Sequence, residues 1–177
     1  MMHAAFRQLI ANQYEASLCT LMHCAEECPD SHWNVLVARY PFSQVIFHTL
    51  FFADYYLGND AESFRLQTFH TENRDLFSDY EQLKDQEPKS VYSREQIEMY
   101  GKFCRDKASA TIAEEAEQTL CSEACFARRN FSRAELHVYN IRHIQHHAPQ
   151  LILRLRIDTK VDIPWIDNGW REPTDES

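Results

Sequence analysis

Three histidines near the end of the chain have the types and spacing of metal ligands. His143 and His147 are four residues apart, and His146 lies between them. Residues four apart share one face of a helix, so the imidazoles of His143 and His147 can point at one position inside a helical bundle. His48, in the middle of a second and strongly apolar stretch, is the natural third ligand. The sequence therefore predicts a divalent-metal site.

Buried histidines without a metal are the simpler alternative. A single histidine on an apolar helix face more often bonds a backbone carbonyl or a water than a metal, and this holds for His48 as well. Two imidazoles on one apolar face are harder to satisfy, because an unpaired buried polar group costs about 1–3 kcal/mol. Spacing also leaves the second ligand of the pair open, since His143 and His146, three apart, nearly share a face.

Four long stretches have the apolar periodicity of amphipathic helices and are expected to position these histidines. They span residues 3–28, 41–58, 93–117 and 131–157. Pro41 is expected at the first position of the second helix, and Gly58 ends that helix. The last two helices open with capping boxes that begin at Ser93 and Ser132. We therefore expect an all-α protein, a four-helix bundle formed by a single domain over residues 1–177.

The connecting segments are less regular. Residues 59–91, with Pro88 near their far end, are too long for an ordinary connection, so they form either short helices over one end of the bundle or a mobile lid over a pocket. Residues 118–130 either extend the third helix or form a short helix of their own. The tail after Ile157 loses helical periodicity, and Trp165 and Trp170 are expected to pack it back onto the bundle.

The composition limits the partners. With 18 Lys and Arg against 27 Asp and Glu, the net charge is -9. Such a charge argues against a general nucleic-acid binder and against a protein of anionic membranes. The first residues lack the pattern of a signal peptide, and no apolar run reaches the length of a membrane span. We expect a soluble, cytoplasmic protein whose partners are small molecules or proteins.

The six cysteines are expected to be free thiols, because a chain of this length can bury a core without disulfides. Cys24 and Cys28 are four residues apart, and so are Cys121 and Cys125. Such pairs are a weaker metal-site signal than CxxC. Small apolar filler on helix faces is the favoured interpretation.

Two of these helices, with a third segment in support, resemble the DinB/YfiT-like metalloenzyme family. The resemblance rests on FSQVIFHTLFFADYYLG around His48 and on HVYNIRHIQHHAPQL around His143 and His147, with CPDSHWN between the first two helices. The resemblance implies one divalent metal on His48, His143 and His147, and its glutamine position, here Gln150, favours His147 over His146. It also implies an up-down-down-up bundle, often a homodimer, and relatives that use low-molecular-weight thiols as cosubstrates.

One departure from the family lies directly after the last histidine. The family usually has arginine and glycine, or small residues, before the glutamine, whereas this chain has Ala148 and Pro149. Proline cannot donate a hydrogen bond to Gln145 and disfavours helical geometry at Ala148. We therefore expect the helix to bend just past His147.

Three imidazoles are ligands that suit Zn, Ni, Fe or Cu, and Zn is the default by availability. Three protein ligands leave a position for water or substrate, as catalytic zinc sites do. The leading hypothesis is a metal-dependent transferase or hydrolase with a small-molecule substrate. Glu135, Tyr139 and Asp54 are candidates for a catalytic base only by their place in the sequence. Since none of the three is convincing, a non-catalytic metal-binding or interaction protein is the alternative.

Overall fold

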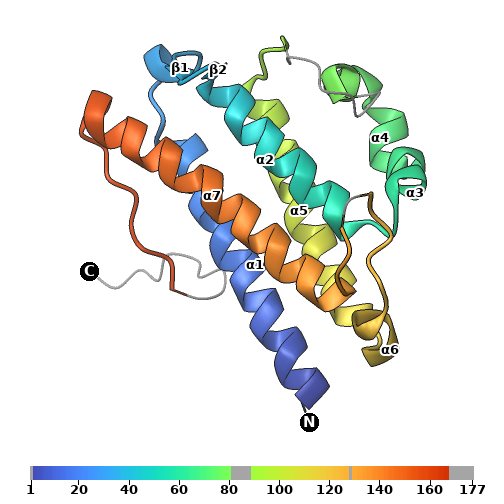
Figure 1. Ribbon diagram of the computed structural model, residues 1–177. Helices are drawn as coiled ribbons and strands as arrows, with labels where there is room; N and C mark the ends of the chain where they lie inside the picture. The colour runs from blue at the N-terminus through green and yellow to red at the C-terminus, as the bar shows by residue number, and fades with distance from the viewer. Residues whose placement is uncertain (1, 81–88, 128, 168–177) are drawn as a thin grey trace.

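The computed structural model describes residues 2–80, 89–127 and 129–167. These residues are mostly helical, which agrees with the predicted all-α class. Helices α1 and α2 each pack against both α5 and α7. Figure 1 shows that α1 and α7 run in one direction and α2 and α5 in the other. The four long helices are α1 (Met2–Glu27), α2 (Phe42–Leu57), α5 (Arg94–Glu114) and α7 (Arg133–Thr159).

Shorter elements join and cover the long helices. β1 and β2 form a small antiparallel hairpin before α2, and α3, α4 and η2 follow α2 on the outside of the molecule (Figure 1). Their bounds are η1 (Asp30–His32), β1 (Leu36–Val37), β2 (Tyr40–Pro41), α3 (Ala61–Leu66), α4 (Thr68–Glu72), η2 (Arg74–Tyr80) and α6 (Glu117–Cys121). Of the two structures expected for residues 59–91, the described part therefore forms short helices. Pro88 lies outside the described residues.

The helix starts follow the local capping signals. The Ser93 hydroxyl accepts from the Gln96 amide and the Gln96 side chain accepts from the Ser93 amide, which confirms this capping box. The Ser132 hydroxyl accepts from the Glu135 amide at the start of α7. Pro41 is the N-cap residue of α2, so the helix begins one residue later than predicted. Where a capping side chain accepts a hydrogen bond from the first amides of a helix, the local sequence determines the residue at which that helix begins.

The end of the third long helix differs from the prediction. Helix α5 ends at Glu114, three residues early, because Glu115 takes an extended conformation and turns its carboxylate toward Arg133 and His137. The separate α6 follows, which settles residues 118–130 in favour of a short helix.

The expected packing of Trp165 is wrong. Its side chain is 89% exposed, and Ile163, 4% exposed, is the apolar residue that fixes the end of the tail. Trp170 lies outside the described residues. None of the helices in the described parts of the chain is both long and apolar enough to cross a bilayer.

Helix α2 is the most deeply buried of the four long helices because it contacts α5 and α7 while α3, α4 and η2 lie beside it (Figure 1). It buries polar as well as apolar side chains, among them Gln44, Thr49 and Asp54. Buried polar groups need partners, since each one left without a partner costs about 1–3 kcal/mol. The chemistry of this protein is therefore concentrated where α2 meets its neighbours.

Candidate metal centre

Three histidines from α2 and α7 converge. His48 lies in the middle of α2, and His143 and His147 lie one turn apart on α7. One nitrogen from each ring forms a group whose members all lie within 4.8 Å of one another. The ring centroid of His48 is 5.5 Å from that of His143 and 5.0 Å from that of His147. In the described residues this is the one group of three or more histidine, cysteine or carboxylate side chains with metal-binding geometry.

The geometry separates His147 from His146. His146 is exposed and does not belong to the group, although its ring contacts that of His147 with centroids 5.1 Å apart. His143 and His147 have ring centroids 4.8 Å apart and both face His48. Helix α7 thus presents the pair with the four-residue spacing to α2. The cysteine pairs take no part in such a group among the described residues.

The residues fit a small divalent ion. Zn–N bonds of about 2.0–2.1 Å place the nitrogens of a tetrahedral site about 3.4 Å apart. From a group within 4.8 Å, the rings need to close by about an ångström and a half at most, which side-chain torsions can supply. The Nδ1 atoms of both His143 and His147 are buried without a hydrogen-bond partner. Each of these rings therefore carries a polar atom that the protein itself leaves unsatisfied.

His137, two turns earlier on α7, shows what a satisfied buried histidine looks like in the same helix. Its Nδ1 lies 3.1 Å from the Tyr14 hydroxyl, and its Nε2 lies 2.6 Å from the Glu115 carboxylate. Both ring nitrogens thus have protein partners. The alternative of a simple core histidine describes His137, but it does not account for His143 and His147.

Burial keeps the three imidazoles neutral. Burial first, and the neighbouring histidines second, lower the pKa of His48 to about 4 and that of His143 to about 3. The pKa of His147 is also lowered, first by burial and then by His146. A neutral imidazole has the free lone pair that a metal needs, so all three rings are ready to bind at neutral pH.

Aromatic side chains surround the group. The Phe52 ring contacts the rings of both His48 and His143, with centroid distances of 4.9 Å and 5.6 Å. The Tyr80 hydroxyl is 3.4 Å from Nδ1 of His48. These rings restrict the water around the histidines and fix the orientation of His48.

The residues considered for a catalytic base lie elsewhere. Glu135 is exposed in the first turn of α7, and the Tyr139 hydroxyl accepts a hydrogen bond from Arg129. Asp54 is six residues beyond His48 on α2 and bonds to α5 and α4. None of these three side chains belongs to the histidine group.

A second polar cluster centres on Asp54, which is fully buried. Its carboxylate accepts hydrogen bonds from the Tyr100 hydroxyl at 2.8 Å and His70 at 2.7 Å, and it pairs with Lys107. Burial alone would raise the pKa of Asp54, but the bond from His70 and the charge of Lys107 outweigh it and lower the pKa. Sequence reasoning missed this cluster. A lone carboxylate in so apolar a helix was its only signal.

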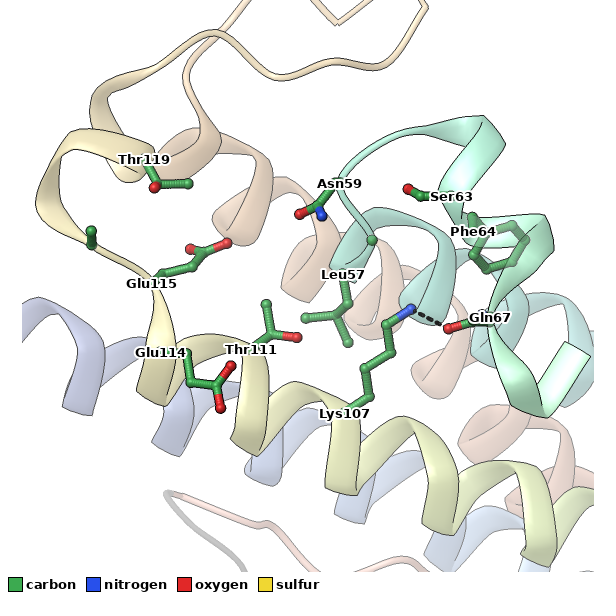
Figure 2. Close-up of a pocket in the computed structure, with 12 residues that line it drawn as sticks. Leu57, Asn59, Ser63, Phe64, Gln67, Lys107, Thr111, Glu114, Glu115 and Thr119 are labelled. Carbon is green, nitrogen blue, oxygen red and sulfur yellow. Dashed lines mark hydrogen bonds between the residues drawn. The ribbon is translucent and has the colours of Figure 1, made fainter.

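A pocket of about 470 Å³ lies where α2 and α5 end, beside α3 and α6 (Figure 2). Among the residues that line the pocket, Lys107 donates hydrogen bonds to Gln67 and Asp54, and the Glu115 carboxylate pairs with Arg133 and His137. Its inner charged groups are therefore committed to the fold. The pocket begins at Leu57, nine residues past His48 on α2, or roughly 13 Å along the helix, so it is separate from the histidines.

No family model matches the sequence, and no curated protein or solved structure matches it either.

Proposed function

We propose that the protein binds one divalent metal ion through His48, His143 and His147. The observation that carries the proposal is the contrast within α7: His137 has a protein partner at both ring nitrogens, whereas His143 and His147 each bury an Nδ1 atom with none. A cation on the rings removes the cost of burying three imidazoles together. The four long helices then form a bundle of the DinB/YfiT-like type, which the resemblance of the two histidine segments supports.

We further propose a metal-dependent transferase or hydrolase. Zn is the default ion, with Ni and Fe as alternatives, since neutral imidazoles suit all three. When bound, the ion supplies a Lewis acid that lowers the pKa of a water or thiol ligand. The residues of the chain hold the ion and, through Phe52 and Tyr80, exclude water beside it. A low-molecular-weight thiol as cosubstrate and assembly as a homodimer belong to the same proposal.

Metal content measured by elemental analysis tests the binding site. We expect about one divalent ion per chain in the wild-type protein and a loss of most of it in His48→Ala, His143→Ala and His147→Ala. The matched control is His146→Ala, one residue from a proposed ligand, which should keep the ion. Full occupancy in the His48 variant would overturn the three-histidine site.

A non-catalytic metal-binding protein is the second candidate. The positions of Glu135 and Asp54 favour it, because Glu135 is exposed at the start of α7 and Asp54 accepts hydrogen bonds from Tyr100 and His70 instead of facing the histidines. Cobalt-substituted protein separates the two candidates. If the metal has an open position, adding a small thiol should produce a sulfur-to-cobalt charge-transfer band, which His143→Ala should lack. A cobalt spectrum that neither thiols nor small anions change would support the non-catalytic protein.

A further inference from the structure

The Tyr80 side chain lies beside His48. It is the last residue of η2, and its hydroxyl lies 3.4 Å from Nδ1 of His48. Its ring is stacked on Phe51, with centroids 4.4 Å apart, and contacts Phe47 at 5.6 Å. Two buried aromatic rings thus hold the Tyr80 ring, and with it the hydroxyl, in a fixed place beside the imidazole.

Gln44 lies behind this hydroxyl. It precedes His48 by one turn of α2, is 1% exposed, and has its Nε2 atom 3.5 Å from the Tyr80 hydroxyl. Its other amide atom, Oε1, is buried without a hydrogen-bond partner. The amide oxygen and nitrogen of Gln44 can therefore exchange places by rotation about the last side-chain bond. In that orientation, the oxygen can accept a hydrogen bond from the Tyr80 hydroxyl.

We propose that Tyr80 is a positioning residue for the metal site. Its hydroxyl accepts the Nδ1–H of His48 and donates its own proton to the Gln44 amide oxygen, which leaves the Nε2 lone pair of His48 for the metal. The inference rests on the proposed function, because it assigns an outer partner to one of the three proposed ligands.

The physical reason is that a metal-bound imidazole has one nitrogen on the metal and an N–H on the other. An acceptor for this N–H selects the tautomer and fixes the ring, and losing such an acceptor typically lowers metal affinity about 10–100-fold. The Tyr80 hydroxyl offers His48 such an acceptor, so the protein sets the orientation of this ring before the metal arrives.

Metal affinity, measured by competition with a chromophoric zinc chelator, tests the inference. Tyr80→Phe keeps the ring on Phe51 and removes only the hydroxyl, so we expect zinc to bind about 10–100-fold more weakly than to the wild type. Gln44→Met, which keeps the length of the side chain, should weaken zinc binding less. Tyr92→Phe is the matched control, since Tyr92 is buried and stacked on Phe47, and it should bind zinc as the wild type does.

A proton spectrum of the zinc-loaded protein gives a second readout that a purely structural role would not move. The wild type should show a slowly exchanging imidazole N–H of His48, which Tyr80→Phe should lose while its circular dichroism stays unchanged. Equal zinc affinity and an unchanged N–H signal in Tyr80→Phe would overturn the inference and leave the metal site intact. Absence of zinc binding to the wild type would instead overturn the proposed function.

Discussion

At the histidines, burial and metal binding favour the same protonation state. A group removed from water avoids charge, and the imidazoles of His48 and His143 therefore remain neutral far below neutral pH. A metal binds only the neutral ring. In solvent, protons would compete with the metal from about pH 6.5 downward, but in this protein the competition begins much lower. The protein thus prepares its ligands by the same packing that buries them.

The same shifts predict how the stability of the metal-free protein depends on pH. The unfolded histidines take up protons below about pH 6.5, whereas folded His48 and His143 do so only near pH 4 and pH 3. Their contribution to stability is therefore fully present above about pH 6.5 and is lost as the pH falls. For each histidine, the free energy of unfolding falls by at most about 1.4 kcal/mol for every pH unit that the pH is lowered in this window.

Urea unfolding of chelator-treated protein between pH 7.5 and pH 5 measures this loss. The free energy of unfolding should fall with pH for the wild type and fall less steeply for His48→Gln, which cannot be protonated at this position. Comparing the two proteins cancels the contributions of other groups. Parallel curves would show that burial does not lower the pKa of His48.

At the scale of helices and segments, Asp54 fastens residues 61–80 to the long helices. It stands on α2 and accepts hydrogen bonds from Gln67 and His70, on the outer segment, and from Tyr100, on α5. Tyr80, which touches His48, ends this same segment. The Asp54 cluster therefore keeps the outer segment, including one wall of the histidine site, against α2.

Asp54→Ala should destabilise the protein strongly without removing a metal ligand. It leaves Lys107 and His70 buried without their anionic partner, and breaking one side of a buried ion pair typically costs about 3–5 kcal/mol. Hydrogen exchange should accelerate throughout α3, α4 and η2. Metal stoichiometry of the folded protein should stay near one per chain.

Asp60→Ala is the control for this prediction. Asp60 caps α3 through the amides of Glu62 and Ser63, so its loss should affect α3 alone. If the two variants accelerate exchange over the same residues, then Asp54 does not fasten the segment.

The long helices could be predicted from the sequence because their signals are local. Ser93 and Ser132 cap the helices they precede, and Gly58 ends α2. The end of α5 could not be predicted, because Glu115 leaves the helix to reach Arg133, 18 residues away. Likewise, Asp54 and Lys107 are 53 residues apart, and only the packing of α2 on α5 brings them together. Spacing within one helix predicts the pair His143 and His147, but it does not predict that Asp54 and Lys107 come together.

The C-terminal half of α7 stays helical through a proline. Pro149 removes one backbone donor, and a bend after His147 stays a prediction. Helix α7 continues to Thr159, with Pro149 exposed and with Ala148, Leu151 and Leu155 buried. Apolar burial on the inner face stabilises the helix on both sides of the proline, whose cost in a helix interior is about 3 kcal/mol.

At the scale of the whole molecule, the cysteines fall into one group in the core and one group on the surface. All six are free: Cys121 and Cys125 are exposed, whereas Cys19 and Cys24 in α1, Cys28 directly after α1 and Cys104 in α5 are buried. Burial raises the pKa of Cys19 and Cys28 to about 11 and that of Cys24 to about 12. The thiolate is the reactive form, so burial slows these thiols both by blocking the reagent and by removing the nucleophile.

Titration with an aromatic disulfide reagent at pH 8, without reductant, should therefore show two fast thiols in the native protein and six after denaturation. Cys121→Ser with Cys125→Ser should remove the fast phase and leave four thiols that react only as the chain unfolds. Cys19 and Cys24 lie in α1, Cys28 follows α1 directly, and Cys104 lies in α5, so the slow phase reports on the interface of α1 and α5 and on the core around it. Fewer than six thiols after denaturation would reveal a disulfide. More than two fast thiols in the native protein would mean that this interface opens in solution.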